Sequence, residues 1–216
     1  VVTELPGSGA GVLEAGRVQA WVVGPGIGTD DVARSLVAQV LLADVPVLVD
    51  ADGLTILGQH RELLAGRTAP TVVTPHAGEL ARLLGLEPST RGDIEARRLH
   101  HARAAAAGLG VTVLLKGSTT VVCTPEGATR VNPTGTSWLA TAGSGDVLSG
   151  ITGALLAGGL SAFDAASCAA YLHGAAARIA SRRTFDGVGA AGGQAPIVAA
   201  DVVDALPSAI AGLSPA

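Results

Sequence analysis

The 216-residue chain has no methionine, few aromatic residues, two cysteines and a single lysine. Aromatic residues make up only 2% of the chain while hydrophobic residues make up 48%, so alanine, valine, leucine and isoleucine must form the core. Because residue 1 is not methionine, we expect the chain to be a fragment or a processed product. Its length suits one α/β domain, which we place at residues 1–216.

Other absences exclude several classes of protein. A net charge of −4 provides no basic surface for nucleic acid or for a membrane. Cys123 and Cys168 have no metal-ligand spacing, and reduced thiols are typical of a cytoplasmic protein. The sequence shows no signal peptide and no apolar run that is long and clean enough to span a bilayer. The composition therefore favours neither a nucleic-acid-binding protein nor a membrane protein.

Short apolar runs alternate with helical patterns along the chain. We expect strands at residues 18–23, 45–50, 71–73 and 111–115, and a hairpin at 120–123 and 129–131. We expect helices at residues 29–42, 77–84, 91–107, 147–156, 165–181 and 196–210, and one near Gly53. This alternation predicts a mostly parallel sheet with helices on both faces, whose ligands sit at the carboxyl ends of the strands. The glycine-rich stretch 186–194 is interpreted as a flexible connection.

The most informative segment is the glycine-dense turn at residues 141–150, which leads directly into a helical pattern. Glycines let the backbone approach a ligand, and a helix start presents unpaired N–H groups to an anion. Asp146 lies inside this turn, where a carboxylate would repel a phosphate unless it had a task. The segment suggests phosphoryl transfer to a hydroxyl with Asp146 as the base. The alternative is an ordinary turn whose acidic residue favours the helix dipole.

Other strand ends carry weaker signals with structural alternatives. Residues 24–28 alternate glycine with other residues, which also suits a plain tight turn. Asp50 and Asp52 could organise Mg²⁺ or cap the following helix. His76 could belong to a site, or could cap a helix together with Glu79 in its first turn.

The last two signals come from the second half of the chain. Lys116 could meet a nucleotide phosphate or be a solvated strand end. The turn at residues 132–135 could fold over the same ligand as the glycine turn. The remaining histidines, including His173, are interpreted as structural or solvated.

Taken together, five motifs resemble one family. They are Gly24-Pro25-Gly26-Ile27-Gly28, Asp50-Ala51-Asp52-Gly53, Thr74-Pro75-His76-Ala77-Gly78-Glu79, Lys116-Gly117-Ser118-Thr119-Thr120, and Asn132-Pro133-Thr134-Gly135 followed by Gly143-Ser144-Gly145-Asp146. In this order they are similar to the ADP- or ATP-dependent NAD(P)H-hydrate dehydratases, whose fold is ribokinase-like. The resemblance extends from about residue 17 to residue 211.

The resemblance implies a lyase that repairs hydrated NADH and NADPH by phosphorylating the ring hydroxyl and eliminating phosphate. It implies that Asp146 is the base and that Gly26 and His76, with Asp146, contact the substrate. It implies that Mg²⁺ bridges the phosphates of ADP or ATP, with help from Glu79 through water. The nucleotide would be held by Lys116, Gly117, Ser118, Thr119, Thr120, Asn132, Thr134, Gly143, Ser144 and Gly145.

The sequence departs from the family pattern in three places. Ala142 stands where the family usually has glycine, and Trp138 stands where it usually has a smaller residue. The family domain also normally begins with a further strand and helix, so we expect N-terminal strands to be missing here. Many bacterial relatives carry an epimerase domain upstream, and the family often forms homo-oligomers. We expect both for the full-length protein.

Two other functions remain open from the sequence. A ribokinase-like kinase of a hydroxymethylpyrimidine or thiazole alcohol would use the same base and the same anion turn. A protein that binds adenylates without catalysis would use only the anion turn. The sequence does not choose between ADP and ATP.

Overall fold

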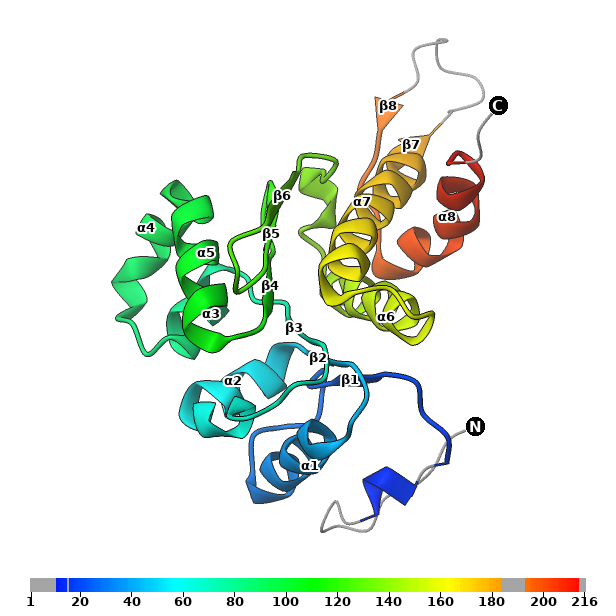
Figure 1. The fold of residues 1–216 in the computed structure, drawn as a ribbon. Coiled ribbons are helices and arrows are strands. Elements are labelled where there is room, and N and C mark those ends of the chain that lie inside the picture. Colours follow the sequence, from blue (N-terminus) through cyan, green and yellow to red (C-terminus); the bar gives the residue numbers. More distant parts are fainter. Residues whose placement is uncertain (1–10, 15, 184–192, 214–216) are drawn as a thin grey trace.

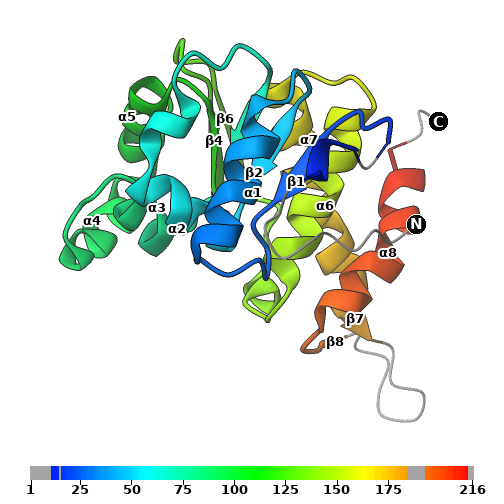
Figure 2. The same ribbon diagram turned by 90° about the horizontal axis from the view of Figure 1, so that it is seen from below.

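A computed structural model describes residues 11–14, 16–183 and 193–213. Its centre is a six-stranded sheet in which the strands lie in chain order from β1 to β6. Figure 1 shows helices α1 to α5 on one side of this sheet and α6 to α8 on the other, and Figure 2 shows the same layers from below. In this part of the chain, no helix combines the length and the apolar character needed to cross a membrane.

Three of the strand pairings are parallel and two are antiparallel. Strands β1 (Trp21–Val23), β2 (Val47–Val49), β3 (Thr71–Val73) and β4 (Thr112–Leu115) pair in parallel. Strands β5 (Thr120–Cys123) and β6 (Thr129–Asn132) form the expected antiparallel hairpin beside β4. An isolated parallel bridge between His76 and Lys116 lies just beyond β3 and β4 and places these two residues side by side. The predicted mostly parallel sheet is confirmed.

The first helix layer contains α1 (Asp31–Leu42), α2 (Ala51–Gln59), α3 (Ala77–Leu83), α4 (Arg91–Ala96) and α5 (Arg98–Leu109). The single helix expected at residues 91–107 is wrong, because the backbone at Arg97 leaves the helical region with φ −123° and ψ 42° and divides it. Asp30 caps α1 by accepting a hydrogen bond from the Ala33 N–H. Short 3₁₀ helices at Val12–Glu14, Arg61–Leu64, Pro88–Thr90 and Ser137–Leu139 were not predicted.

The second layer contains α6 (Ser144–Ala157), α7 (Ala162–Ser181) and α8 (Ala199–Ala211). The predicted starts at residues 147 and 165 are three residues late, and the start predicted at 196 is three residues early. Helix α7 begins after Ser161, whose side chain accepts the Asp164 N–H. Arg182–Arg183 and Gly193–Gln194 form a two-stranded ribbon, β7 and β8. The rest of the predicted flexible stretch, residues 186–192, lies outside the described residues.

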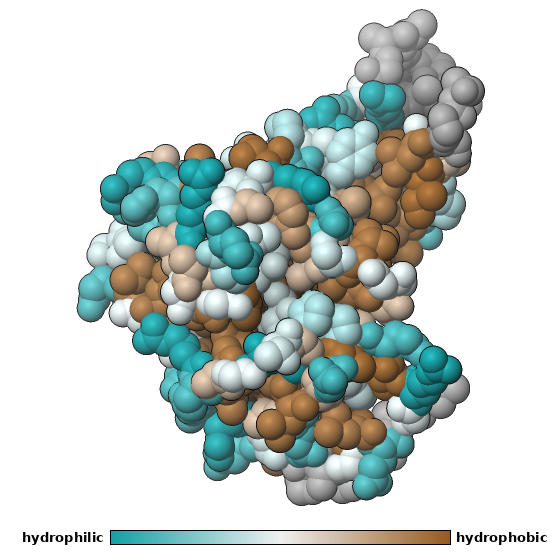
Figure 3. All heavy atoms as spheres, in the orientation of Figure 1, coloured by the Kyte–Doolittle hydropathy of each residue, from teal (hydrophilic) through white to brown (hydrophobic). Residues whose placement is uncertain are grey.

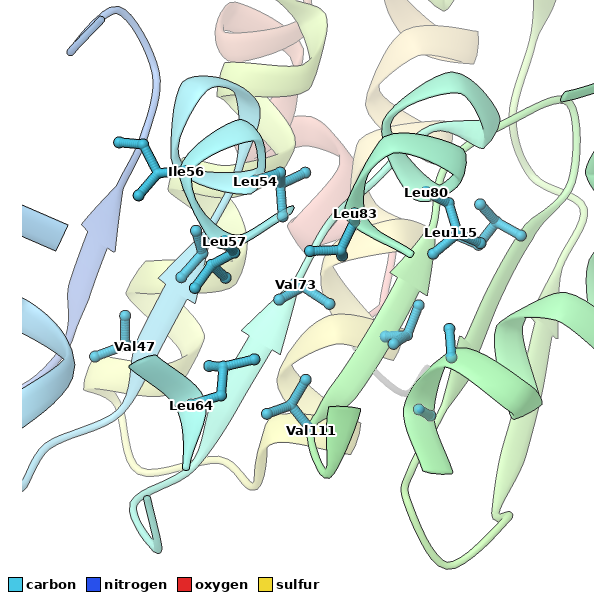
Figure 4. Close-up of a cluster of buried hydrophobic side chains, with 14 of the residues drawn as sticks. Val47, Leu54, Ile56, Leu57, Leu64, Val73, Leu80, Leu83, Val111 and Leu115 are labelled. Carbon is cyan, nitrogen blue, oxygen red and sulfur yellow. The ribbon is translucent and has the colours of Figure 1, made fainter. Parts of the chain in front are cut away.

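Alternate residues of β2 to β5 enter two different cores. On β2, Val47 and Val49 face the α1–α5 layer, whereas Leu48 faces α6 and α7. The first core is rich in leucine, as Figure 4 shows for Leu54, Leu57 and other labelled side chains around β2, β3 and α2. The second core is closed mainly by alanines of α7. These are Ala165, Ala166, Ala169 and Ala170. Small side chains let α7 approach the sheet closely, so the residues at its C-terminal half can reach the strand ends.

Candidate active site

A cavity of about 760 Å³ lies where residues following β3 and β4 meet the start of α6 and the middle of α7. Eight residues singled out from the sequence line it, although they come from four separate segments of the chain. These are His76, Lys116, Gly117, Ser118, Thr120, Asn132, Ser144 and Gly145. Five predicted residues do not line the cavity, although each lies within three residues of one that does. They are Glu79, Thr119, Thr134, Gly143 and Asp146; Gly26, in the turn after β1, is a sixth that does not line it.

The start of α6 forms the floor expected for an anion. Gly143 is its N-terminal cap and adopts φ +80°, a conformation that glycine reaches without strain. The Ser144 hydroxyl donates to the Leu139 carbonyl at 2.6 Å, so it fixes the loop rather than pointing freely into the cavity. Ala142 is exposed and does not line the cavity. The left-handed backbone falls on Gly143, so the methyl group of Ala142 does not narrow the site.

Lys116 is held by an ion pair that connects three elements. Its Nζ lies 2.8 Å from Asp50 Oδ1, and Asp50 is only 1% exposed at the end of β2. The other oxygen of Asp50 accepts a hydrogen bond from Ser149 Oγ of α6 at 2.7 Å. A Cβ on Gly145 would lie 3.5 Å from Lys116 Nζ, which shows how close the ammonium is to the first turn of α6. The lysine is therefore placed beside the helix N-terminus, where both attract phosphate oxygens.

Arg98 of α5 positions the loop that follows Lys116. Its guanidinium donates to the carbonyls of Leu115 (3.1 Å), Lys116 (2.6 Å) and Thr119 (3.0 Å). It also pairs with Glu95, which lines the cavity. A Cβ on Gly117 would come within 2.3 Å of this guanidinium, so a side chain there would displace Arg98. No local pattern in the sequence pointed to Arg98, because it lies in an Arg- and Ala-rich helix.

His76 is both a helix cap and a cavity residue. Its Nδ1 accepts the N–H groups of Gly78 and Glu79, and Glu79 Oε2 accepts the His76 N–H at 2.7 Å. Burial lowers the pKa of His76, and Lys116 lowers it further, while Glu79 opposes this effect. The ring is therefore neutral at neutral pH, and Nδ1, as the acceptor in the cap, carries no proton. Its Nε2 then carries the proton and can donate a hydrogen bond.

The glycine turn after β1 and the aspartate motif after β2 are in close contact. A Cβ on Gly24 would lie 1.8 Å from the Asp50 carbonyl oxygen, so only glycine fits there. The Gly28 N–H donates to Asp52 Oδ2 at 2.9 Å. Between the two aspartates, Ala51 adopts φ +48°, which is strained for a residue with a side chain. The Asp50 carboxylate accepts no capping hydrogen bond and instead holds Lys116 and Ser149, so the capping alternative for this residue is wrong.

Three predicted residues occupy neighbouring turns. Thr134 donates through Oγ1 to Asn132 Oδ1 at 3.0 Å, which shapes the turn above the cavity. Thr119 contributes its carbonyl to Arg98. Gly26 adopts φ +70° in the turn after β1, and a Cβ built on it would meet no atom within 4 Å. The open space above Gly26 leaves room for a ligand to approach its backbone.

Asp146 is exposed in the first turn of α6 and directly follows Gly145, which lines the cavity. Among the described residues its carboxylate forms no hydrogen bond and no ion pair. A carboxylate without a partner has both oxygens available for a proton of a bound ligand. This is the property that the predicted base requires.

His173 of α7 was interpreted as structural or solvated, and the second alternative is wrong. It is 7% exposed, lines the cavity, and its Nε2 has no hydrogen-bond partner. Burial lowers the pKa of His173 to about 4, and Lys116 lowers it further, while hydrogen bonding to the Ser144 backbone opposes this effect. A histidine in an otherwise alanine-rich stretch of helix was the signal available in the sequence.

The residues around the cavity fit Mg²⁺ only as an ion carried with a nucleotide. The described part of the chain has no group of three acidic, histidine or cysteine side chains that could enclose a metal. The Asp50 and Glu79 carboxylates already hold Lys116 and the α3 cap, respectively. Mg²⁺ commonly binds through one or two carboxylates plus substrate phosphates, and the exposed Asp146 beside the α6 cradle suits this arrangement. Glu79 could then act only through water.

Comparisons with known proteins agree with this geometry. The chain is 59% identical over 153 residues to the bifunctional NAD(P)H-hydrate repair enzyme of Mycobacterium tuberculosis, a match that covers 71% of this chain and 31% of that protein. The chain thus spans about a third of that curated relative. Two solved structures are also similar.

The first is the ADP/ATP-dependent NAD(P)H-hydrate dehydratase of Bacillus subtilis, co-crystallised with ATP and Mg²⁺ and soaked with CoA. It has a TM-score of 0.74 and 30% identity over 91% of this chain and 67% of that chain. The second is a ribokinase-like superfamily protein of Enterococcus faecalis, with a TM-score of 0.69 and 25% identity over 90% of this chain and 63% of that chain. The expected ribokinase-like fold is confirmed. A model of the NAD(P)H-hydrate dehydratase family matches residues 1–191, and the chain belongs to this family.

Proposed function

We propose that this chain dehydrates hydrated NADH or NADPH in a reaction driven by ADP or ATP. The observation that carries the proposal is the convergence of the α6 N-terminus, Lys116 and the loop after β4 on one cavity, with an unpartnered carboxylate one residue away. The names of the M. tuberculosis and B. subtilis proteins support this substrate and this nucleotide. Each residue has a separate task in the reaction.

The chemistry begins at the ring hydroxyl of the hydrated nicotinamide. Asp146 accepts the hydroxyl proton while the oxygen attacks the terminal phosphorus of the nucleotide. The bond from this phosphorus to the bridging oxygen breaks, and AMP leaves when ADP is the donor, or ADP leaves when ATP is the donor. The C–O bond of the phosphate ester then breaks, and inorganic phosphate leaves with the bonding electrons. The neighbouring ring carbon gives up a proton to solvent, and the ring double bond returns. Phosphate is a far better leaving group than hydroxide, which explains why a nucleotide is consumed.

The protein contributes position and charge more than covalent chemistry. In this proposal the N–H groups of Gly143 and Gly145 and the Lys116 ammonium face the transferred phosphate. The Ser144 N–H, which donates to the Thr141 carbonyl at 3.3 Å, would exchange this bond for the phosphate. The remaining loop and turn residues hold the rest of the nucleotide. These are Gly117, Ser118, Thr119, Thr120, Asn132 and Thr134. Mg²⁺, when it is bound with the phosphates, neutralises their charge.

The substrate lies on the other side of the transferred phosphate in this proposal. The backbone of Gly26 and the ring of His76 contact the hydrated nicotinamide. His76 Nε2, which carries the proton, donates to an oxygen of the substrate. Glu79 supports the metal through water while its carboxylate keeps the α3 cap closed.

The test is an assay of the 216-residue chain with hydrated NADH, Mg²⁺ and either ADP or ATP. We expect the near-ultraviolet absorbance of the reduced nicotinamide to return, with release of one phosphate for each NADH. Phosphorylation of a hydroxymethylpyrimidine or thiazole alcohol without this return would replace the proposal with a vitamin-precursor kinase. Nucleotide binding without either reaction would indicate a non-catalytic adenylate-binding protein.

We also propose a cytoplasmic location, a homo-oligomer, and an upstream epimerase domain in the full-length protein. The M. tuberculosis relative is named bifunctional and extends well beyond the matched segment, which supports a second domain. Hydrophobic residues gather at the surface over α8 in Figure 3, and the exposed ones include Val198, Val203 and Ile210. Light scattering coupled to size exclusion would give the mass in solution, and a monomeric mass would contradict self-association.

A further inference from the structure

His173 carries one of two buried side-chain atoms that lack a hydrogen-bond partner in the described part of the chain. The other is Thr124 Oγ1, which does not line the cavity. His173 does line it, and the residue is only 7% exposed. Buried polar atoms in folded proteins are almost always paired, so an unpaired one that borders a cavity points to a ligand. The nucleotide proposed for this cavity is the ligand that can supply the missing partner.

The chemistry of the ring defines what this partner must be. Hydrogen bonding to the Ser144 backbone raises the pKa of His173, as expected when the ring donates a proton to a carbonyl. Because Nε2 is the nitrogen without a partner, the donor to Ser144 is Nδ1. Burial keeps the ring neutral at neutral pH. A neutral ring that donates from Nδ1 presents a lone pair at Nε2, so the ligand must bring a hydrogen-bond donor.

We propose that His173 Nε2 accepts a hydrogen bond from a hydroxyl or amino group in the nucleoside part of the bound ADP or ATP. Ionised phosphate oxygens are acceptors and would repel the lone pair, whereas ribose hydroxyls and the adenine amino group are donors. Lys116 and the start of α6, which attract the phosphates, line the same cavity. This inference rests on the nucleotide site of the proposed function. It adds to that site a residue that selects the nucleoside.

The helix that carries His173 is fixed firmly against the turn over the cavity. The next residue is Gly174, where a Cβ would lie 2.2 Å from Thr134 Oγ1, so the turn approaches the bare helix backbone. Further along α7, Arg178 donates to the carbonyls of Thr134 at 2.6 Å and Pro133 at 3.2 Å. The imidazole is thus held in place before a ligand arrives, which favours selective recognition.

The test is calorimetric titration of the 216-residue chain and of His173→Phe with ADP. Phenylalanine keeps the ring volume but removes the acceptor, and the loss of one hydrogen bond corresponds to roughly a three- to tenfold weaker affinity. His173→Gln offers a carboxamide oxygen and should recover part of the loss. His100→Phe, on the exposed side of α5, is the matched control and should bind as the unchanged chain does.

Three analogues identify the donor on the ligand. They are 2′-deoxy-ADP, 3′-deoxy-ADP and inosine diphosphate, which lack one ribose hydroxyl, the other ribose hydroxyl and the amino group, respectively. The analogue without the donor should bind the unchanged chain more weakly than ADP and should bind His173→Phe as weakly as ADP does. If His173→Phe weakens the binding of ADP and of all three analogues by the same factor, the assignment to the nucleoside is overturned. Unchanged binding of ADP by a folded His173→Phe would overturn it as well.

Thermal unfolding of each variant shows whether it is folded. If His173→Phe is unfolded, the unchanged chain alone decides. The analogue that lacks the donor should bind it roughly three- to tenfold more weakly than ADP, and equal affinity for ADP and all three analogues would overturn the assignment. The titrations need no hydrated cofactor, so their result is independent of turnover. A chain that binds ADP with this pattern but does not dehydrate NADH hydrate contradicts the proposed function alone. A chain that dehydrates it without this pattern contradicts the role of His173 alone.

Discussion

Asp50 and Asp146 each lie beside a residue that lines the strand-end cavity, but their surroundings are opposite. Asp50 is 1% exposed, pairs with Lys116 and accepts a hydrogen bond from Ser149. Asp146 is exposed and forms no hydrogen bond and no ion pair with any described residue. A buried, fully paired carboxylate has no free lone pair in the right place for a ligand proton, whereas an exposed carboxylate has several. The comparison teaches that Asp50 positions a charge and that Asp146 is available for chemistry.

His173 is the intermediate case, because it is buried like Asp50 and unpaired like Asp146. Burial without an ionic partner lowers its pKa to about 4. These three residues therefore predict three different responses to mutation or to pH. The first predictions concern stability and run from the largest expected effect to the smallest.

Asp50→Asn should cause the largest loss of stability. It removes the nearer negative partner of Lys116, at 2.8 Å, and leaves only Glu79, at 3.6 Å, to compensate the ammonium beside the helix N-terminus. Breaking one side of a buried pair lowers the free energy of unfolding by about 3–5 kcal/mol, and the 19% exposed lysine side chain places this case at the low end. Urea unfolding measures the change. Asp31→Asn, in an exposed pair with Arg34, is the control and should change stability by about 0.5 kcal/mol or less.

Lowering the pH should reduce the stability of the folded protein through His173. The unfolded chain binds a proton at this residue near pH 6.5, whereas the folded chain resists it down to about pH 4. The unfolded state therefore holds more protons between these values, and stability should fall by about 3 kcal/mol as the pH is lowered from 6.5 to 4. Denaturant unfolding across this range measures the fall. The same series on His173→Phe should be flatter, and an identical slope would contradict the buried, unpaired state of the imidazole.

Asp52→Ala should have the smallest effect of the three on stability. It removes one hydrogen bond, from the Gly28 N–H, that locks the turn after β1 to the turn after β2. The expected loss is about 1 kcal/mol, measured by urea unfolding. A larger effect on the KM for hydrated NADH than on the affinity for ADP would place this lock beside the substrate. Equal losses of both would contradict that placement.

The local sequence predicted the strands and the α6 turn because both depend on neighbouring residues. Val47, Leu48 and Val49 form a continuous apolar run, which is typical of a strand that is buried on both faces. His76 and Glu79 have the spacing of a capping box, so the capping alternative was visible in the sequence. The same pattern did not reveal that His76 also lines the cavity.

Contacts between distant residues could not be predicted in this way. Asp50 lies 66 residues from Lys116 and 99 from Ser149, and no local pattern connects them. Arg98 lies in an Arg-rich helix, and nothing in the sequence distinguishes it from the other arginines there. Its contacts with three carbonyls are visible only in the structure. The resemblance to a family assigned the separate motifs to one site. The structure supplied the ion pair, the loop support and the buried imidazole.

The most direct test of the distinction between the two aspartates is the turnover of Asp146→Asn with ADP and hydrated NADH. We expect the turnover number to fall by a factor of about 10²–10⁴, because the base that accepts the hydroxyl proton is lost. Titration with ADP in the same preparation should show binding within about threefold of the unchanged chain, since Lys116 and the α6 cradle remain. Unchanged turnover of Asp146→Asn would show that another group accepts the proton, and would contradict the account.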